Sequence, residues 1–210
     1  MINFTLIITF ILSYLIGSIP FGLILSKLSG YGDIRMIGSG NIGATNVLRT
    51  GNKLLALFVL LLDSIKGYIA VKNLYLFSPP EMFDIIVSIS ALGVVLGHCF
   101  PIWLKFKGGK GVATAIGVIF ALQPISGLTT VLLWIIVALI FKKSSLSSLV
   151  SLMSASISIL ILSGSLQTLS MIIIIIISFY RHKENIYRLM VNKEPKIFDK
   201  INLNFKNLIK

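Results

Sequence analysis

Apolar residues occur in long stretches along this chain, and polar residues are concentrated in the segments between them. The first stretch covers about residues 2–28 and has no charged residue before Lys27. Further apolar runs follow at about residues 54–72, 83–104, 112–123, 126–141, 146–163 and 166–180. A helix needs roughly 20 apolar residues to cross a bilayer, so each run predicts a membrane helix, although several are short. The first run lacks the basic start of a signal peptide and predicts a retained transmembrane helix.

The breaks between runs predict the overall architecture. Gln123-Pro124 separates the fourth run from the fifth, because Pro is costly inside a helix, and Lys142-Lys143 ends the fifth. We therefore expect an all-α polytopic membrane protein, a bundle of about seven short transmembrane helices. Residues 1–210 are predicted to form a single integral membrane domain whose tail, after about residue 197, is peripheral. A five-span alternative, with the fourth and fifth runs as one re-entrant pair, stays open.

Composition supports a membrane protein and excludes several other classes. The 210 residues are 56% hydrophobic and only 12% charged, against about 25% charged in soluble domains. The net charge of +12 would suggest nucleic-acid binding, but the basic residues lie between membrane runs, so we interpret them as topology signals and predict no nucleic-acid partner. Cys99 is the single cysteine and His98 and His182 are the two histidines. This excludes disulfide scaffolds and zinc fingers, and no metal or cofactor is predicted.

The basic residues predict an orientation in the membrane. With seven spans, 17 of the 19 Lys and Arg residues fall on one side, while Lys72 falls on the other and Lys66 lies within a span. Under the positive-inside rule the basic side is cytoplasmic. The N-terminus is then outside and the C-terminus cytoplasmic, with the lipid bilayer as the surrounding partner.

The first loop on the basic side has the composition of an anion-binding backbone nest. Gly and small polar residues dominate it and an Arg ends it: Gly38, Ser39, Gly40, Asn41, Gly43, Thr45, Asn46 and Arg49. A flexible connector is the alternative interpretation. The glycines also match the dinucleotide fingerprint, but that motif needs a preceding strand, and here a membrane helix precedes the loop.

The third loop combines glycines with two cations just before an apolar run, as Lys107, Gly108, Gly109, Lys110 and Gly111. A Walker A loop is unlike this segment, because Gly111 stands where its Ser or Thr would follow the Lys. A permissive backbone, two cations and a helix start nevertheless favour phosphate binding. The alternative is a basic anchor for lipid headgroups, which would need no special backbone.

Further polar residues lie in the tail and in the second span. If the seventh helix continues beyond the membrane, His182 and Asn185 share one of its faces, although a solvated basic helix end is the common alternative. All three polar segments lie on one membrane side, so together they predict one anion pocket. Asp63 and Lys66 are three residues apart within the second span and can pair there. A purely structural pair and a role in the pocket both stay open.

Three segments together resemble a known family: residues 38–49, 97–114 and 181–194. They are similar to the cytoplasmic motifs of the bacterial acyl-phosphate:glycerol-3-phosphate acyltransferases of the inner membrane, and the similarity extends over about residues 13–196. The resemblance implies transfer of a fatty acyl group from acyl phosphate to the sn-1 hydroxyl of glycerol 3-phosphate, the first acylation of bacterial phospholipid synthesis. The products would be lysophosphatidic acid and phosphate. It also implies seven helices and an active site facing the cytoplasm.

The resemblance also implies roles for individual residues. Ser39, Arg49, His182 and Asn185 match catalytic positions. The implied substrate-binding residues are Gly38, Gly40, Asn41, Gly43, Thr45, Asn46, Lys107, Gly108, Gly109, Lys110, Gly111, Arg188 and Glu194. One departure is Asn192, where the family usually has Gly. Asn is the next most tolerant residue for a left-handed turn, so we expect that turn to survive.

The implied substrates suit a protein that works by positioning. Acyl phosphate is already activated, so no covalent acyl-enzyme is needed, and proximity and electrostatics suffice. A substrate phosphate is the expected proton acceptor, and His182 is the protein candidate for that role. The soluble enzyme that makes acyl phosphate could dock transiently on the basic face. Rival interpretations are an anion transporter, which predicts a polar path through the membrane, and a membrane scaffold, which leaves the Gly-rich loops unexplained.

Overall fold

The described part of the protein is helical throughout. A computed structural model describes residues 2–76, 80–162 and 165–197, and within these ranges it contains no strand. The predicted peripheral tail after residue 197 lies outside them. The α-helices are α1 (Ile2–Gly17), α2 (Phe21–Leu28), α3 (Ala44–Leu48), α4 (Lys53–Leu76), α5 (Phe83–Cys99), α6 (Val112–Leu122), α7 (Pro124–Phe141), α8 (Ser144–Leu162), α9 (Ser165–Arg181) and α10 (Lys183–Met190). Short 3-10 turns lie at Ile34–Met36, Pro80–Met82 and Ile102–Leu104.

Every predicted apolar run is mainly helical, but the helices differ in length. Five segments of the described chain are long and apolar enough to cross a membrane: Phe4–Leu28, Lys53–Asn73, Pro80–Leu104, Pro124–Phe141 and Ser144–Leu162. Helices α6 and α9 are apolar but shorter. The all-α membrane architecture is thus confirmed. The count of seven spans and the orientation of the termini stay predictions.

The first apolar run is not one continuous helix, contrary to expectation. Helix α1 ends at Gly17 and α2 begins at Phe21, with Pro20 between them at φ −91° and ψ 72°. Pro has no N–H to continue the hydrogen-bond ladder, so a break at this position is favoured. The ammonium group of Lys66 donates to the carbonyl oxygen of Ile19 at 2.8 Å. A side chain from the second span therefore satisfies the backbone where the first run breaks.

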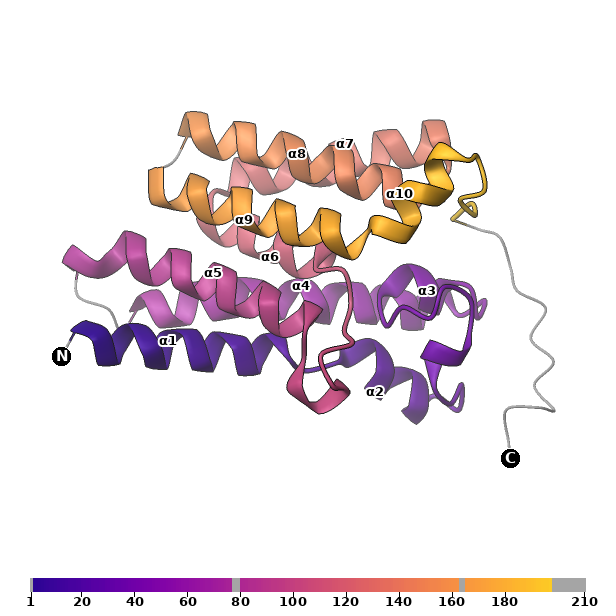
Figure 1. Cartoon of the computed structure of the whole chain (residues 1–210), viewed down its shortest axis with the longest axis horizontal. Helices are drawn as coiled ribbons and strands as arrows, with labels where there is room; N and C mark the ends of the chain where they lie inside the picture. The colour runs from indigo at the N-terminus through magenta and orange to yellow at the C-terminus, as the bar shows by residue number, and fades with distance from the viewer. Residues whose placement is uncertain (1, 77–79, 163–164, 198–210) are drawn as a thin grey trace.

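At the other end of the chain, the structure answers whether the seventh helix continues beyond its apolar run. Helix α9 ends at Arg181, and His182 adopts φ −97° and ψ 6° before α10 begins. The predicted seventh helix therefore does not run straight past the membrane. The break turns α10 across the end of the bundle, next to α8 (Figure 1).

Glycines allow the helices of the bundle to approach closely. A methyl group added at Gly97 on α5 would lie 2.1 Å from the carbonyl oxygen of Tyr14 on α1. On the α4–α6 pair, the same addition at Gly117 would lie 1.8 Å from the carbonyl oxygen of Ser64, and at Gly67 it would lie 2.2 Å from that of Thr114. In lipid, where apolar burial gives little drive for association, such backbone contact is a main source of helix packing.

The arrangement of the helices brings the polar segments to one end of the molecule. The long helices lie roughly side by side, and α3, α10 and the segment between α2 and α3 are gathered at the opposite end from the start of α1 (Figure 1). The main apolar core joins α4, α5, α6, α8 and α9, with Val94, Ile119 and Leu152 fully buried in it. A second apolar cluster around Ile34, Ile37 and Val47 supports the first loop. The loop is therefore packed, not a flexible connector.

Replacing Gly117 with Ala is expected to destabilise the fold by about 1–3 kcal/mol, because the added methyl would meet the backbone of α4. Thermal unfolding in detergent measures the change. Gly127→Ala is the matched control, since the three atoms nearest to its methyl belong to the side chain of Phe120 and not to backbone. Both variants gain the same helix propensity, about 0.5–1 kcal/mol, so their difference reports the clash. Equal stabilities would contradict backbone packing between α4 and α6.

Candidate functional site

A cavity of about 520 Å³ lies where the three polar segments meet. Its polar wall comes from the loop before α3, the start of α6, the start of α8, the α9–α10 junction and Glu194. Its apolar wall comes from three membrane helices, through Leu60, Leu61, Ile116, Phe120, Val131, Trp134 and Ile135. The cavity therefore has a charged end and an apolar end, which suits an amphipathic ligand.

The first loop is organised around the side chain of Asn46. Its Oδ1 accepts hydrogen bonds from the backbone N–H of Ser39 at 3.0 Å and from the Ser39 hydroxyl at 3.3 Å. Its Nδ2 lies 2.8–3.0 Å from the carbonyl oxygens of Ile34, Ile37 and Asn41. Asn46 is only 2% exposed, so its main work is to fold the loop. It thereby places Ser39 on the cavity wall.

Arg49 and Thr45 attach this loop to the rest of the site. Arg49 follows α3, is 9% exposed and lines the cavity. The Thr45 hydroxyl lies 3.0 Å from that of Ser144 at the start of α8. Gly38 and Gly40 have φ of 58° and 69°, a conformation that glycine adopts at little cost. These two glycines shape the loop without lining the cavity.

The third loop is bonded through its backbone on both sides. The N–H groups of Gly108 and Gly109 donate to the carbonyl oxygens of Cys99 and His98, at 3.1 and 3.0 Å. The guanidinium of Arg181 donates to the carbonyl oxygens of Gly109 and Gly108, at 2.9 and 2.6 Å. Arg181 therefore holds protein backbone and not a ligand. The loop is fixed where it delivers Lys110 to the cavity.

Lys110 is the cation that the third loop presents to the cavity. Its ammonium group donates to Oδ1 of Asn185 at 2.5 Å. The pKa of Lys110 is lowered to about 8. Burial is the main cause, Glu194 opposes it, and the charges of Arg188 and Arg49 add to it. The amine is therefore mostly charged at neutral pH and becomes neutral in mildly alkaline solution.

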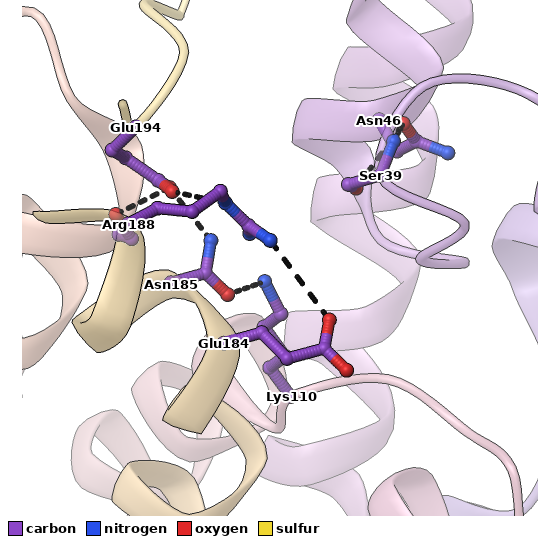
Figure 2. Close-up of polar contacts among 8 residues, drawn as sticks. Ser39, Asn46, Lys110, Glu184, Asn185, Arg188 and Glu194 are labelled. Atoms are coloured by element: carbon purple, nitrogen blue, oxygen red, sulfur yellow. Dashed lines mark hydrogen bonds and ion pairs between the residues drawn. The ribbon is translucent and has the colours of Figure 1, made fainter. Parts of the chain in front are cut away.

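The Glu194 carboxylate accepts hydrogen bonds from three side chains, and Figure 2 shows it beside Asn185 and Arg188. It accepts from the Ser145 hydroxyl at 2.7 Å, from Asn185 Nδ2 at 2.6 Å and from Arg188 Nε at 2.8 Å. Burial opposes ionisation, but the three hydrogen bonds outweigh it and lower the pKa of Glu194. The carboxylate thus orients Asn185, whose other end receives Lys110.

His182 is held as a neutral ring with one nitrogen committed. Its Nδ1 donates to the carbonyl oxygen of Ser178 at 2.8 Å. Burial and the nearby charge of Lys110 lower the pKa of His182 to about 4. A neutral imidazole with the proton on Nδ1 carries a lone pair on Nε2. Since His182 lines the cavity, this ring can accept a hydrogen bond there.

Two smaller predictions can be compared directly with the structure. Asn192, which replaces the usual glycine, has φ 54°, so the expected left-handed turn is present. Asp63 and Lys66 pair at 2.6 Å as expected, and both are almost fully buried. Asp63 also lines the cavity, as does His98.

The structure brings most of the predicted site residues together. Lining the cavity are Ser39, Asn41, Gly43, Thr45, Asn46, Arg49, Lys110, Gly111, His182, Asn185 and Glu194. Not lining it are Gly38, Gly40, Lys107, Gly108, Gly109 and Arg188. Arg188 faces Glu194 instead, with Glu184 3.9 Å away, and Lys107 is exposed. Their roles in binding stay predictions.

Sequence reasoning missed several residues of this wall. Ser144 and Ser145 line the cavity from the start of α8, and Trp134 lines it from α7. The two serines belong to a Ser-rich apolar run, and no sequence feature distinguishes them from the neighbouring serines that hydrogen-bond to their own helix. Groups of His, Cys, Asp and Glu that could hold a metal ion are absent among the described residues.

Replacing Glu194 with Gln is expected to lower the thermal midpoint in detergent at pH 7, because the charge-assisted bond from Arg188 is lost. The pKa of Glu194 is lowered in the folded state, so its stabilisation exists above the ordinary carboxyl pKa and is lost as pH falls through the folded value. The difference from wild type should shrink on acidification from about pH 7 to about pH 3. A constant difference would contradict this interpretation. Glu184→Gln is the control, since that carboxylate is 76% exposed.

Comparisons with known proteins agree with the arrangement of the site. A family model described as glycerol-3-phosphate acyltransferase matches residues 7–192. The glycerol-3-phosphate acyltransferase of Paramagnetospirillum magneticum is 50% identical over 184 residues, covering 88% of this chain and 90% of that protein. That of Bartonella henselae is 45% identical over 196 residues, covering 93% of each.

A solved structure is also similar over nearly the whole chain. It is the crystal structure of PlsY, an integral membrane glycerol 3-phosphate acyltransferase, in its glycerol 3-phosphate form. The TM-score is 0.84 at 35% identity, with 98% of this chain and 99% of that chain covered. Because the family model and these relatives match most of its length, the chain belongs to the glycerol-3-phosphate acyltransferase family.

Proposed function

We propose that the protein transfers a fatty acyl group from acyl phosphate to the sn-1 hydroxyl of glycerol 3-phosphate, giving lysophosphatidic acid and phosphate. The observation that carries this proposal is a cavity of about 520 Å³ that has a charged end with Arg49 and Lys110 and an apolar end. Both substrates carry a phosphate, and one of them also carries a long alkyl chain. Membership of the family supports glycerol 3-phosphate as the acceptor.

The phosphates would bind at the polar end of the cavity. Arg49 and Lys110 both line it and approach it from different segments of the chain. Helix α6 begins at Val112, directly after Lys110 and Gly111, and the N–H groups at a helix start favour an anion. Ser39 and Asn41 supply hydrogen-bonding groups on the same wall, which suits the hydroxyl groups of glycerol.

The acyl chain would lie along the apolar wall. Leu61 on α4 and Ile135 on α7 are 45% and 43% exposed in the protein alone, so this wall is open at its sides. Both helices are apolar enough to cross a membrane, so lipid would contact the opening. An alkyl chain could then enter from the bilayer while the phosphate stays at the polar end.

The reaction needs no covalent enzyme intermediate. The sn-1 oxygen attacks the carbonyl carbon, forming the ester bond, and the bond from that carbon to the phosphate oxygen breaks. Phosphate leaves, and it can take up the hydroxyl proton. Nε2 of His182 is a second acceptor, although its pKa of about 4 makes it a weak base. Catalysis then comes from holding the two substrates together beside Lys110 and Arg49.

We expect this reaction at the cytoplasmic face of the bacterial inner membrane, and the distribution of basic residues supports that expectation. They lie mostly in the segments that form the polar end of the bundle, so the positive-inside rule puts this end inside. Glycerol 3-phosphate would reach the cavity from the cytoplasm. Any docking of the soluble enzyme that makes acyl phosphate is expected on the same basic face.

The purified protein, mixed with palmitoyl phosphate and radiolabelled glycerol 3-phosphate, is expected to form labelled lysophosphatidic acid. Palmitoyl-coenzyme A in place of palmitoyl phosphate is expected to give none, which tests the donor. Ser39→Ala and Arg49→Ala should each reduce kcat/KM by ~100-fold or more, since each removes a group at the polar wall.

Three outcomes would contradict this proposal. Activity with the coenzyme A thioester alone would overturn the donor. Full turnover in both variants would overturn the site. Labelled glycerol 3-phosphate crossing sealed vesicles without being acylated would favour transport.

The pKa of Lys110 predicts how activity depends on pH. Its charge is present below about pH 8 and is lost as pH rises through that value. The KM for the phosphate substrates should therefore rise above about pH 8. In Lys110→Arg the charge persists, so KM relative to its own value at pH 7 should stay flat. Lys105→Arg, at an exposed position, is the control and should keep the wild-type profile. An alkaline rise of the same size in Lys110→Arg would contradict the assignment.

A further inference from the structure

Three ionisable side chains lie together behind the glycine-rich loop, and the proposed chemistry uses none of them. Asp63, Lys66 and His98 are 2%, 4% and 5% exposed. They come from α4 and α5, both in segments apolar enough to span a membrane. An ionisable residue placed inside a membrane costs about 2.5–3.5 kcal/mol even on lenient scales, so a cluster of three needs a reason.

Lys66 forms an ion pair with Asp63 and also contacts the residues at the break between α1 and α2. Its ammonium group lies 2.6 Å from Asp63 Oδ1, 2.8 Å from the carbonyl oxygen of Ile19 and 5.5 Å from the centre of the Phe21 ring. Lys66 does not line the cavity. It is therefore a structural cation that ties α4 to the α1–α2 break.

Asp63 connects this cation to His98. The distance from Asp63 Oδ1 to His98 Nδ1 is 3.6 Å. That nitrogen is buried and makes no hydrogen bond within the described part of the chain, so the carboxylate is its polar neighbour. The contact between α4 and the His98 ring is therefore electrostatic and longer than a hydrogen bond.

His98 in turn supports the glycine-rich loop at Gly109. Its carbonyl oxygen accepts the Gly109 N–H at 3.0 Å. Its ring lies against the same residue, because a methyl group added at Gly109 would be 2.0 Å from Nε2. Three of the four residues 108–111 are glycines without side chains to pack. The position of the loop therefore depends on backbone bonds and on the surface beneath it.

We propose that Asp63 and His98 are positioning residues that set how far the glycine-rich loop lies from α5, so that Lys110 reaches the phosphates in the cavity. The Asp63 carboxylate lies beside Nδ1 of the imidazole, and the Nε2 edge of the same ring contacts Gly109. Because Lys110 follows Gly109 directly, this contact sets the position of Lys110. The link to phosphate rests on the proposed function. The mechanical part, from Asp63 through His98 to Gly109, rests on the contacts alone.

A pair of backgrounds tests the contact between the ring and the loop. The substitution His98→Asn keeps a nitrogen at the place of Nδ1, facing Asp63, but removes the Nε2 edge that contacts Gly109. Gly109→Ala in the His98 background is expected to lower kcat/KM by ~100-fold, mainly through KM, because the loop is pushed outward. In the His98→Asn background the same change should lower it by only ~3-fold, a coupling typical of residues in contact.

Equal losses in the two backgrounds would overturn the proposal. A loss confined to kcat would also overturn it, since a displaced Lys110 should weaken phosphate binding.

Hydrogen exchange of the loop gives a readout that does not need turnover. In Asp63→Asn and His98→Ala, the amides of residues 108–111 should exchange at least ~10-fold faster than in wild type, because the support of the loop is lost. Ser90→Ala is the matched control, a fully buried polar side chain on α5 far from the loop, and should leave the loop unchanged.

The two readouts separate the two proposals. Wild-type protein without acyltransfer, but with faster loop exchange in the two variants, would refute the proposed function and keep the positioning role. Active protein whose loop exchange is the same in wild type, Asp63→Asn and His98→Ala would refute the positioning role and keep the function.

Discussion

The hydrogen bonds that converge on the Glu194 carboxylate join the segments that form the site. The carboxylate receives Ser145 from α8, and Asn185 and Arg188 from α10. Asn185 then accepts the amine of Lys110, which comes from the loop before α6. Cations crowded at the edge of an apolar bundle repel one another, and one shared anion offsets that repulsion. Without it, Asn185 and Lys110 would have no defined orientation toward the cavity.

Glycine performs two different tasks in this protein. In the bundle, Gly97 and Gly117 let neighbouring helices meet at the backbone, which packing in lipid requires. In the third loop, Gly108 and Gly109 let the chain pass so close to α5 that its N–H groups bond the carbonyl oxygens of that helix. Both uses exploit the missing side chain more than flexibility. The loop is consequently held by hydrogen bonds to its backbone from α5 and from Arg181.

Much of this arrangement could be predicted from residue patterns. The apolar runs predicted each membrane helix, because the bilayer demands long apolar segments whatever their packing. The Gly-rich and basic segments predicted one shared pocket, and they do line one cavity, while anion binding there stays a prediction. Two helix breaks were not predicted, and both were local. Pro20 broke the first run, which was expected to be one helix, and the bend at His182 could not be predicted, since continuation of the seventh helix had been left open. The first break is accompanied by a partner from another helix, Lys66 on α4, whereas the bond of His182 to the carbonyl oxygen of Ser178 lies four residues away along the chain.

The sequence by itself determined the membrane environment, the helical class and the candidate residues of the polar end, because these follow from composition and from short motifs. Only the tertiary structure decided what each cation does. Lys110 and Arg49 line the cavity, whereas Arg181 holds a loop, Arg188 holds Glu194 and Lys66 holds a helix break. A basic residue has the same charge in every one of these roles. Its role depends on whether its side chain lines the cavity or lies against protein groups elsewhere, and that placement exists only once the helices have packed.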